Sequence, residues 1–170
     1  MNKKSFLLVI VVGLFLLVTY EAYAITTRNL KTAVQSIRYR VPVADVRAAT
    51  AVHPSGQRRE LTLFSLPGGD QILSMVTNVK TAFVLPSGAR VLIHSIRPKR
   101  GGVELSPCDV TYTADLSFVN FEHKVGSCGE FAFYDEDLAT DIAVTFVSED
   151  GSDLAGLTAG SVDFIVAKIQ

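Results

Sequence analysis

Apolar and polar residues alternate with a period of two from residue 59 onward, which is typical of strands with one buried face. Turns rich in glycine and proline, such as 67–70 and 85–88, interrupt this alternation. We expect eight short strands, at 60–66, 71–79, 90–96, 110–114, 115–121, 130–134, 142–147 and 162–168. On the second of them, Leu73, Met75, Thr77 and Val79 should share one face.

The connections between these strands show almost no helical periodicity, so the crossover helices that a parallel sheet needs are missing. The pattern therefore predicts an all-β fold, an antiparallel β-sandwich of the jelly-roll or another Greek-key type. An immunoglobulin domain fits less well, because the chain has no tryptophan and its cysteines are not widely spaced.

The N-terminal segment, residues 1–24, has the features of an export signal. Lys3 and Lys4 precede an apolar run at 6–19, and Ala22-Tyr23-Ala24 offers the small residues that a signal peptidase accepts. The segment would also serve as a retained N-terminal hydrophobic helix in a membrane, because such a helix needs about 20 apolar residues. Both alternatives stay open, and both place the rest of the chain outside the cytoplasm.

Residues 25–58 are predicted to form a basic helical or linker arm before the sandwich domain, which we assign to 59–170. Leu30, Val34 and Ile37 recur at spacings of four and three, which indicates one face of a helix, and Pro42 should end it. A chain of 170 residues suits a single domain of this kind.

Composition excludes some classes of protein. With 48% hydrophobic residues the chain can form a core, and a net charge of −1 gives no global basic field for nucleic acid. The charge is unevenly divided, however. Residues 25–100 hold twelve Lys or Arg and three acids, whereas residues 101–170 hold two Lys and thirteen acids. Either the halves interleave in one sandwich, or they form opposite faces through which copies could associate head to tail or meet an anionic membrane or glycan.

Two kinds of stabilising or ligand site can be suggested. In an oxidising compartment Cys108 and Cys128 should form a disulfide, which would contribute about 3 kcal/mol. Calcium requires several carboxylate oxygens, and three of them could come from Asp135, Asp137 and Asp141. The alternative is a solvated loop near the end of a strand, where acidic residues also discourage edge-to-edge aggregation. No other cofactor is expected.

The segment 97–102 combines Arg97, Lys99 and Arg100 with two glycines, which predicts a basic contact loop at the tip of a hairpin. Such a tip is usually only a soluble turn, but it could contact phosphates or sulfated sugars.

Catalytic signatures are missing from the sequence. No G-x-S-x-G elbow, P-loop or dinucleotide fingerprint occurs, and His53, His94 and His123 are scattered along the chain. His94 lies within an apolar strand, where a structural role is the simpler interpretation. We therefore expect a protein that is not an enzyme.

Two stretches resemble turn and strand elements of β-sandwich structural proteins of bacteriophage virions, of the coat or decoration type. These are Leu66-Pro67-Gly68-Gly69-Asp70-Gln71-Ile72, followed by Val79-Lys80-Thr81-Ala82-Phe83, and the terminal Leu157-Thr158-Ala159-Gly160-Ser161-Val162-Asp163-Phe164. The resemblance implies a sandwich fold and a structural role, and it transfers no functional residues. The leader and the expected disulfide depart from that pattern unless the particle contains a membrane that tethers this protein.

Together these features predict a structural or interaction module displayed outside the cytoplasm, either tethered or exported. Its expected partners are copies of itself, other surface or coat proteins, and the membrane if residues 1–24 are retained; nucleic acid is not expected. The alternative is a secreted sandwich that binds glycans or surface ligands, which the absence of tryptophan makes less favourable.

Overall fold

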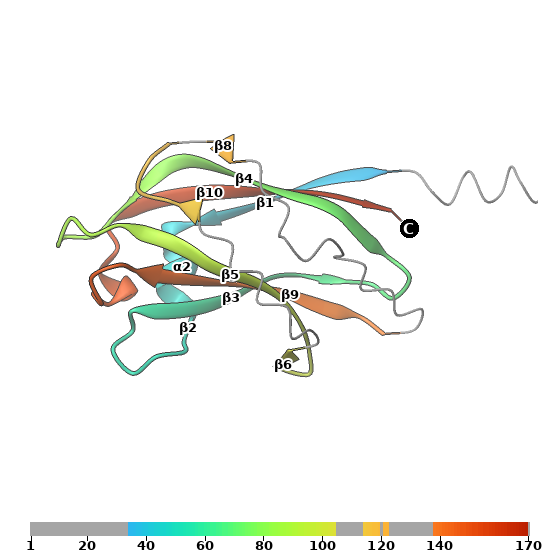
Figure 1. The fold of residues 1–170 in the computed structure, drawn as a ribbon, viewed down its shortest axis with the longest axis horizontal. Coiled ribbons are helices and arrows are strands. Elements are labelled where there is room, and N and C mark those ends of the chain that lie inside the picture. The colour runs from blue at the N-terminus through green and yellow to red at the C-terminus, as the bar shows by residue number, and fades with distance from the viewer. Residues whose placement is uncertain (1–33, 105–113, 120, 123–137, 170) are drawn as a thin grey trace, which may run out of the picture. The chain divides into compact units, whose positions relative to one another are not determined.

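The computed structural model describes residues 34–104, 114–119, 121–122 and 138–169. Residues 35–169 form one compact unit in which the described strands make two antiparallel sheets (Figure 1). The first sheet has the order β1 (Gln35–Pro42), β10 (Ala159–Ile169), β4 (Gln71–Val84) and β8 (Phe121–Glu122). The second has the order β2 (Thr50–Ala51), β3 (Arg58–Leu66), β9 (Thr140–Ser148), β5 (Val91–Arg100) and β6 (Val103–Glu104), and β7 (Ala114–Asp115) also pairs with β5.

Helical structure in the described residues is limited to α2 (Val43–Ala48) and the single 3₁₀ turn η1 (Leu154–Gly156). The predicted all-β, antiparallel architecture is therefore confirmed. The predicted N-terminal hydrophobic helix lies outside the described residues, and no helix within them is long and apolar enough to cross a membrane.

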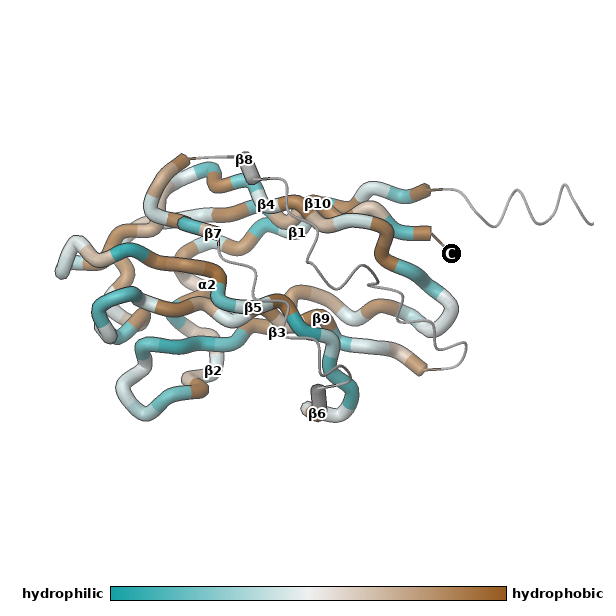
Figure 2. The backbone as a smooth tube through the Cα atoms, in the orientation of Figure 1, coloured by the Kyte–Doolittle hydropathy of each residue, from teal (hydrophilic) through white to brown (hydrophobic). Residues whose placement is uncertain are grey.

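The two sheets share one hydrophobic core, visible as brown segments on the strands of both layers (Figure 2). Each strand contributes alternate side chains, because successive side chains of a strand point to opposite faces. Tyr39 of β1 stacks on Phe64 of β3, with ring centroids 4.3 Å apart and ring planes 9° apart, and so joins the two layers. The first sheet contributes Ile72, Met75, Val79, Phe83, Val162, Phe164 and Val166, and the second Val91, Ile93, Ile96, Ile142, Val144 and Phe146.

The last two long strands occupy central positions. β10 lies between β1 and β4, and β9 lies between β3 and β5, so strands from the acidic half of the chain are inserted between strands from the basic half. Of the two charge arrangements considered above, the described strands show interleaving. Ion pairs such as Arg40 with Asp163 and Arg90 with Glu149 connect the two halves.

The prediction of a helical arm is wrong for residues 35–42. This segment is strand β1, which pairs with β10 from Gln35 opposite Lys168 to Pro42 opposite Ser161. Backbone pairing with a neighbouring strand outweighs a weak local helical pattern, and Ile37, Tyr39 and Val41 also fit a period of two. The folded domain therefore begins near residue 35, before the predicted boundary at 59.

A β-bulge changes the predicted face of β4. Ala167 pairs with Ser74 but Lys168 pairs with Ile72, so Leu73 is the extra residue. Met75 is buried as expected, whereas Leu73 is 45% exposed and Ile72 takes the inward position. The bulge thus moves the alternation by one residue at this end of the strand.

The described part of the predicted strand at 115–121 is largely replaced by a crossing between the sheets, whereas residues 110–113 of the other predicted strand lie outside the described residues. Leu116 is fully buried; its N–H donates to the Val91 carbonyl at 2.8 Å, and its own carbonyl accepts from Phe83 N–H at 2.8 Å. Because these partners belong to different sheets, residue 116 bridges the layers and continues neither strand. The predicted strand at 130–134 lies outside the described residues.

Candidate functional site

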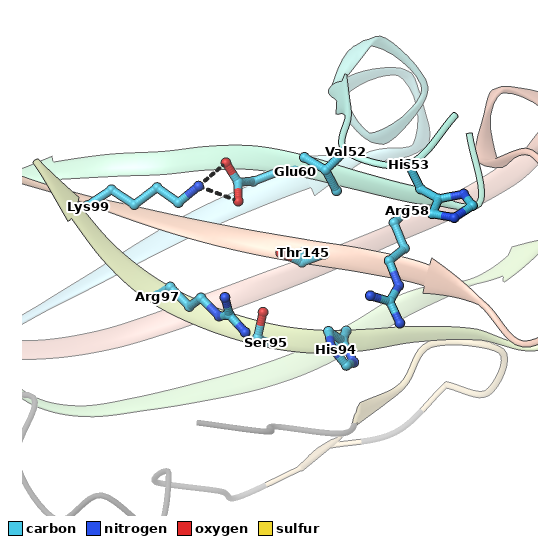
Figure 3. A pocket seen from close by; sticks show the side chains of 9 residues that line it. All are labelled: Val52, His53, Arg58, Glu60, His94, Ser95, Arg97, Lys99 and Thr145. Carbon is cyan, nitrogen blue, oxygen red and sulfur yellow. Dashed lines mark hydrogen bonds and ion pairs between the residues drawn. The ribbon is translucent and has the colours of Figure 1, made fainter. Parts of the chain in front are cut away.

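A basic depression lies on the outer face of the second sheet, over β3, β9 and β5 (Figure 3). The register places Glu60 of β3 and Ser95 of β5 on either side of Thr145 of β9. The depression has a volume of about 280 Å³. Its lining consists of Val52, His53, Arg58, Glu60, His94, Ser95, Arg97, Lys99 and Thr145.

Among the described residues that line the depression, three side chains are cationic and one is a carboxylate. Lys99 Nζ lies 2.6 Å from both Glu60 carboxylate oxygens, and the two side chains are only 17% and 21% exposed. This ion pair connects β5 to β3 across β9, and the charges of Lys99 and Glu60 cancel each other. Among the described residues of the lining, Arg58 is therefore a cation without an ion pair.

Ser95 faces the depression because of a second bulge. Ile93 pairs with Phe146 and Ser95 with Thr145, so His94 is the extra residue in β5. Without the bulge, Ser95 would follow Ile93 into the core; with it, Ser95 turns outward and Ile96 turns inward. Figure 3 shows the Ser95 hydroxyl rising from β5 toward Thr145.

The Ser95 hydroxyl is an unusual group in this fold. The residue is 2% exposed, and its Oγ has no hydrogen-bond partner in the described structure. A buried polar group without a partner costs about 1–3 kcal/mol. A polar atom of a ligand or of a water molecule would complete its hydrogen bonding.

Arg97, Lys99 and Arg100 were predicted to form a hairpin tip, and this placement is wrong. They belong to β5, which continues through Pro98, while the turn itself is made by Gly101 and Gly102 with φ of 57° and 81°. Alternation along the strand separates them: Arg97 and Lys99 line the depression, whereas the Arg100 guanidinium donates to Thr140 Oγ1 at 3.3 Å. Their proposed role in binding a partner stays a prediction.

Sequence reasoning missed Arg58 and Ser95 as site residues. They lie 37 positions apart in the sequence, on strands separated by β9. Only the pairing of β3 and β5 with β9 brings them to one surface, so no local pattern identifies them. His94 lies within a strand, as expected.

The predicted calcium ligands are only partly described. Asp141 lies on β9, where its carboxylate accepts a hydrogen bond from the Ser65 hydroxyl of β3. Asp135 and Asp137 lie outside the described residues, and within those residues no group of three candidate ligands is present. The predicted disulfide partners Cys108 and Cys128 also lie outside them.

The turn between β9 and β10 is the acidic end of the sandwich. Glu149 accepts from Arg90 Nε at 2.8 Å, and Asp153 accepts from Arg59 at 3.0 Å. Asp150 is exposed and accepts two hydrogen bonds from Ser152, one from its backbone N–H at 2.9 Å and one from its hydroxyl at 2.8 Å. These hydrogen bonds lower the pKa of Asp150, so its carboxylate is ionised at neutral pH.

Comparison with known proteins finds no matching family model and no matching curated protein. A solved structure, the capsid of Ralstonia phage GP4, is similar to this chain with a TM-score of 0.51 and 14% sequence identity. The similarity covers 81% of this chain and 84% of that one. At this identity the match shows a shared fold. It agrees, at the level of the fold, with the resemblance to virion structural proteins noted in the sequence.

Proposed function

We propose that this chain is a structural component of a phage particle that acts through assembly and not through catalysis. The observation that carries the proposal is the fold likeness to a phage capsid protein over 81% of the chain. The strand order supports it, because β1-β10-β4-β8 in one sheet and β3-β9-β5-β6 within the other are compatible with a jelly roll, a fold used by viral capsid domains.

The chemistry of the depression also favours binding over catalysis. Glu60, the one carboxylate among the described residues of the lining, is held by both of its oxygens to Lys99 and so is poorly placed to serve as a general base. The described lining residues include no phenylalanine or tyrosine on which a sugar ring could stack. Copies of this chain and other coat proteins are accordingly the proposed partners.

The N-terminal segment 1–24 supports a location outside the cytoplasm, either exported or tethered in a particle that contains a membrane. Mass spectrometry of the purified protein distinguishes these two forms. A mature start at Ile25 would indicate export with cleavage, and an intact N-terminus would indicate tethering.

The proposed function is tested by expressing the full chain and following its mass by light scattering and its particles by electron microscopy. We expect concentration-dependent assemblies with a repeated subunit. A monodisperse monomer at every concentration and ionic strength would overturn the proposal, and a monomer that also binds a glycan would favour the alternative of a ligand-binding sandwich.

A further inference from the structure

Two groups in the basic depression lack partners within the described structure. Arg58 is exposed and forms no ion pair there, and the Ser95 hydroxyl is buried without a hydrogen bond. Both line the same depression, and Figure 3 shows the Arg58 guanidinium extending from β3 toward His94, next to Ser95 on β5. Both groups therefore line one depression.

These donors suit an oxyanion. A guanidinium presents parallel N–H groups that match the two oxygens of a carboxylate, and a serine hydroxyl can donate to the same group. Because Lys99 and Glu60 neutralise each other, the charge of Arg58 is not offset by the other described residues of the lining. A volume of about 280 Å³ is large enough for a short acidic side chain.

The chain itself carries a carboxylate of this kind. In the acidic turn, Arg90 holds Glu149 and Arg59 holds Asp153, whereas Asp150 is exposed and forms no ion pair among the described residues. Its hydrogen bonds with Ser152 keep it ionised and hold it in place. Asp150 is therefore a preorganised anion without a cation.

Within one copy these two features do not meet. Arg58 pairs in the sheet with Val147, three residues before Asp150, yet no ion pair forms between the Arg58 and Asp150 side chains. The depression is on the face of the sheet, whereas Asp150 is in the turn that follows the end of β9. A contact between the two features accordingly requires a second copy.

We propose that the depression around Arg58 and Ser95 binds the Asp150 carboxylate of a second copy of this chain. The contact joins two different surfaces, so each copy offers one donor site and one acceptor turn, and repetition generates a ring or a filament. This inference rests on the proposed assembly function and specifies one contact that performs it.

The test uses two charge reversals, Arg58→Glu and Asp150→Arg, studied separately, mixed and combined in one chain. Each variant alone loses this contact, and we expect its association constant to fall at least tenfold. Mixing them provides the original contact, from the D150R depression to the R58E turn, and a charge-exchanged contact, from the R58E depression to the D150R turn, so the mixture should regain extended assembly that neither variant shows alone. The double variant R58E/D150R exchanges the charges and should regain extended assembly.

Matched controls separate this contact from general charge effects and from misfolding. Arg47→Glu changes an exposed cation away from the depression and should leave assembly unchanged. Arg58→Gln removes the charge without reversing it and should weaken assembly less than Arg58→Glu. Circular dichroism confirms that each variant is folded, and sedimentation velocity at about 0.05 M and 0.5 M salt should show wild-type assembly weakening as screening increases.

The outcomes distinguish the two proposals. If the wild type assembles and R58E and D150R assemble equally well, the Arg58–Asp150 contact is wrong while the structural function stands. If the wild type never assembles, the structural function fails as well. If inorganic phosphate binds the wild type and not R58E while assembly is indifferent to both reversals, the depression is a phosphate site and this inference is refuted.

Discussion

A buried ion pair at one end of the sandwich offers a quantitative test of the fold. Lys168 of β10 donates through Nζ to Asp70 Oδ2 in the turn between β3 and β4. The two side chains are 10% and 5% exposed, so neither charge is well solvated. Alternation along β10 turns Lys168 inward, on the same face as Phe164 and Val166, and the bulge at Leu73 places the buried Ile72 of β4 opposite it.

The cost of breaking this pair follows from desolvation. Removing one partner of a buried pair leaves an uncompensated charge and typically costs about 3–5 kcal/mol, whereas replacing both with apolar groups is often close to neutral. Lys168 lies near the end of β10, where its long side chain can reach water, so the lower end of the range applies. We expect about 3 kcal/mol for Asp70→Ala and for Lys168→Met, and about 1 kcal/mol for the double variant.

Urea unfolding followed by far-ultraviolet circular dichroism measures these changes. With a denaturant dependence of about 1–3 kcal/mol per molar urea, a loss of 3 kcal/mol lowers the unfolding midpoint by about 1–3 M. Lys80→Met, which removes an exposed lysine from β4, is the control and should shift the midpoint little. Single-variant losses that simply add in the double variant would refute the reasoning, because they would show that the two charges do not interact.

Two further predictions concern backbone geometry and pH. Gly160→Ala should destabilise the domain by about 3 kcal/mol, because its φ of 143° disfavours a side chain and the new Cβ would lie 2.3 Å from the Phe83 ring. Gly88→Ala, with φ of 76° and no atom within 4 Å, should cost only about 1 kcal/mol of strain, and equal losses in urea unfolding would contradict this account. The hydrogen bond from Arg40 lowers the pKa of the buried Asp163 in the folded protein. The ionised Asp163 carboxylate therefore stabilises the fold above its unfolded pKa of about 4. This contribution is lost as the pH falls through the lower pKa of the folded state. In the Asp163→Asn variant, the urea unfolding midpoint should therefore decrease less steeply below about pH 4. If the midpoint of the variant decreases as steeply as that of the wild type, Asp163 is not a source of the acid destabilisation.

Much of the strand content could be predicted from periodicity. The stretches at 60–66, 142–147 and 162–168 coincide closely with β3, β9 and β10, because each has a buried face that only alternation can produce. The segment 35–42 was misassigned because its pattern satisfied both periods. The segment is a strand because it pairs with β10, which is more than 100 residues distant in the sequence.

The candidate site was less predictable than the fold. The sequence shows the basic residues at 97–100, but the loop expected there is a strand. Glu60, which pairs with Lys99, and Arg58, which lines the same depression, are on β3. Ser95 could not be identified at all, since its outward orientation depends on a single bulge at His94. A shift of one residue exchanges core and surface along a strand, and composition does not reveal it.

For this protein, the order of apolar and polar residues determined the class of fold, the turns and the unequal division of charge between its two halves. Those properties are local, so they can be recognised in the linear chain. Only the tertiary structure decided three other features. These are the insertion of β9 and β10 between earlier strands, the bulges, and the placement of Arg58 and Ser95 in one depression. They depend on backbone pairing between distant segments, whose register is set by packing of the whole core.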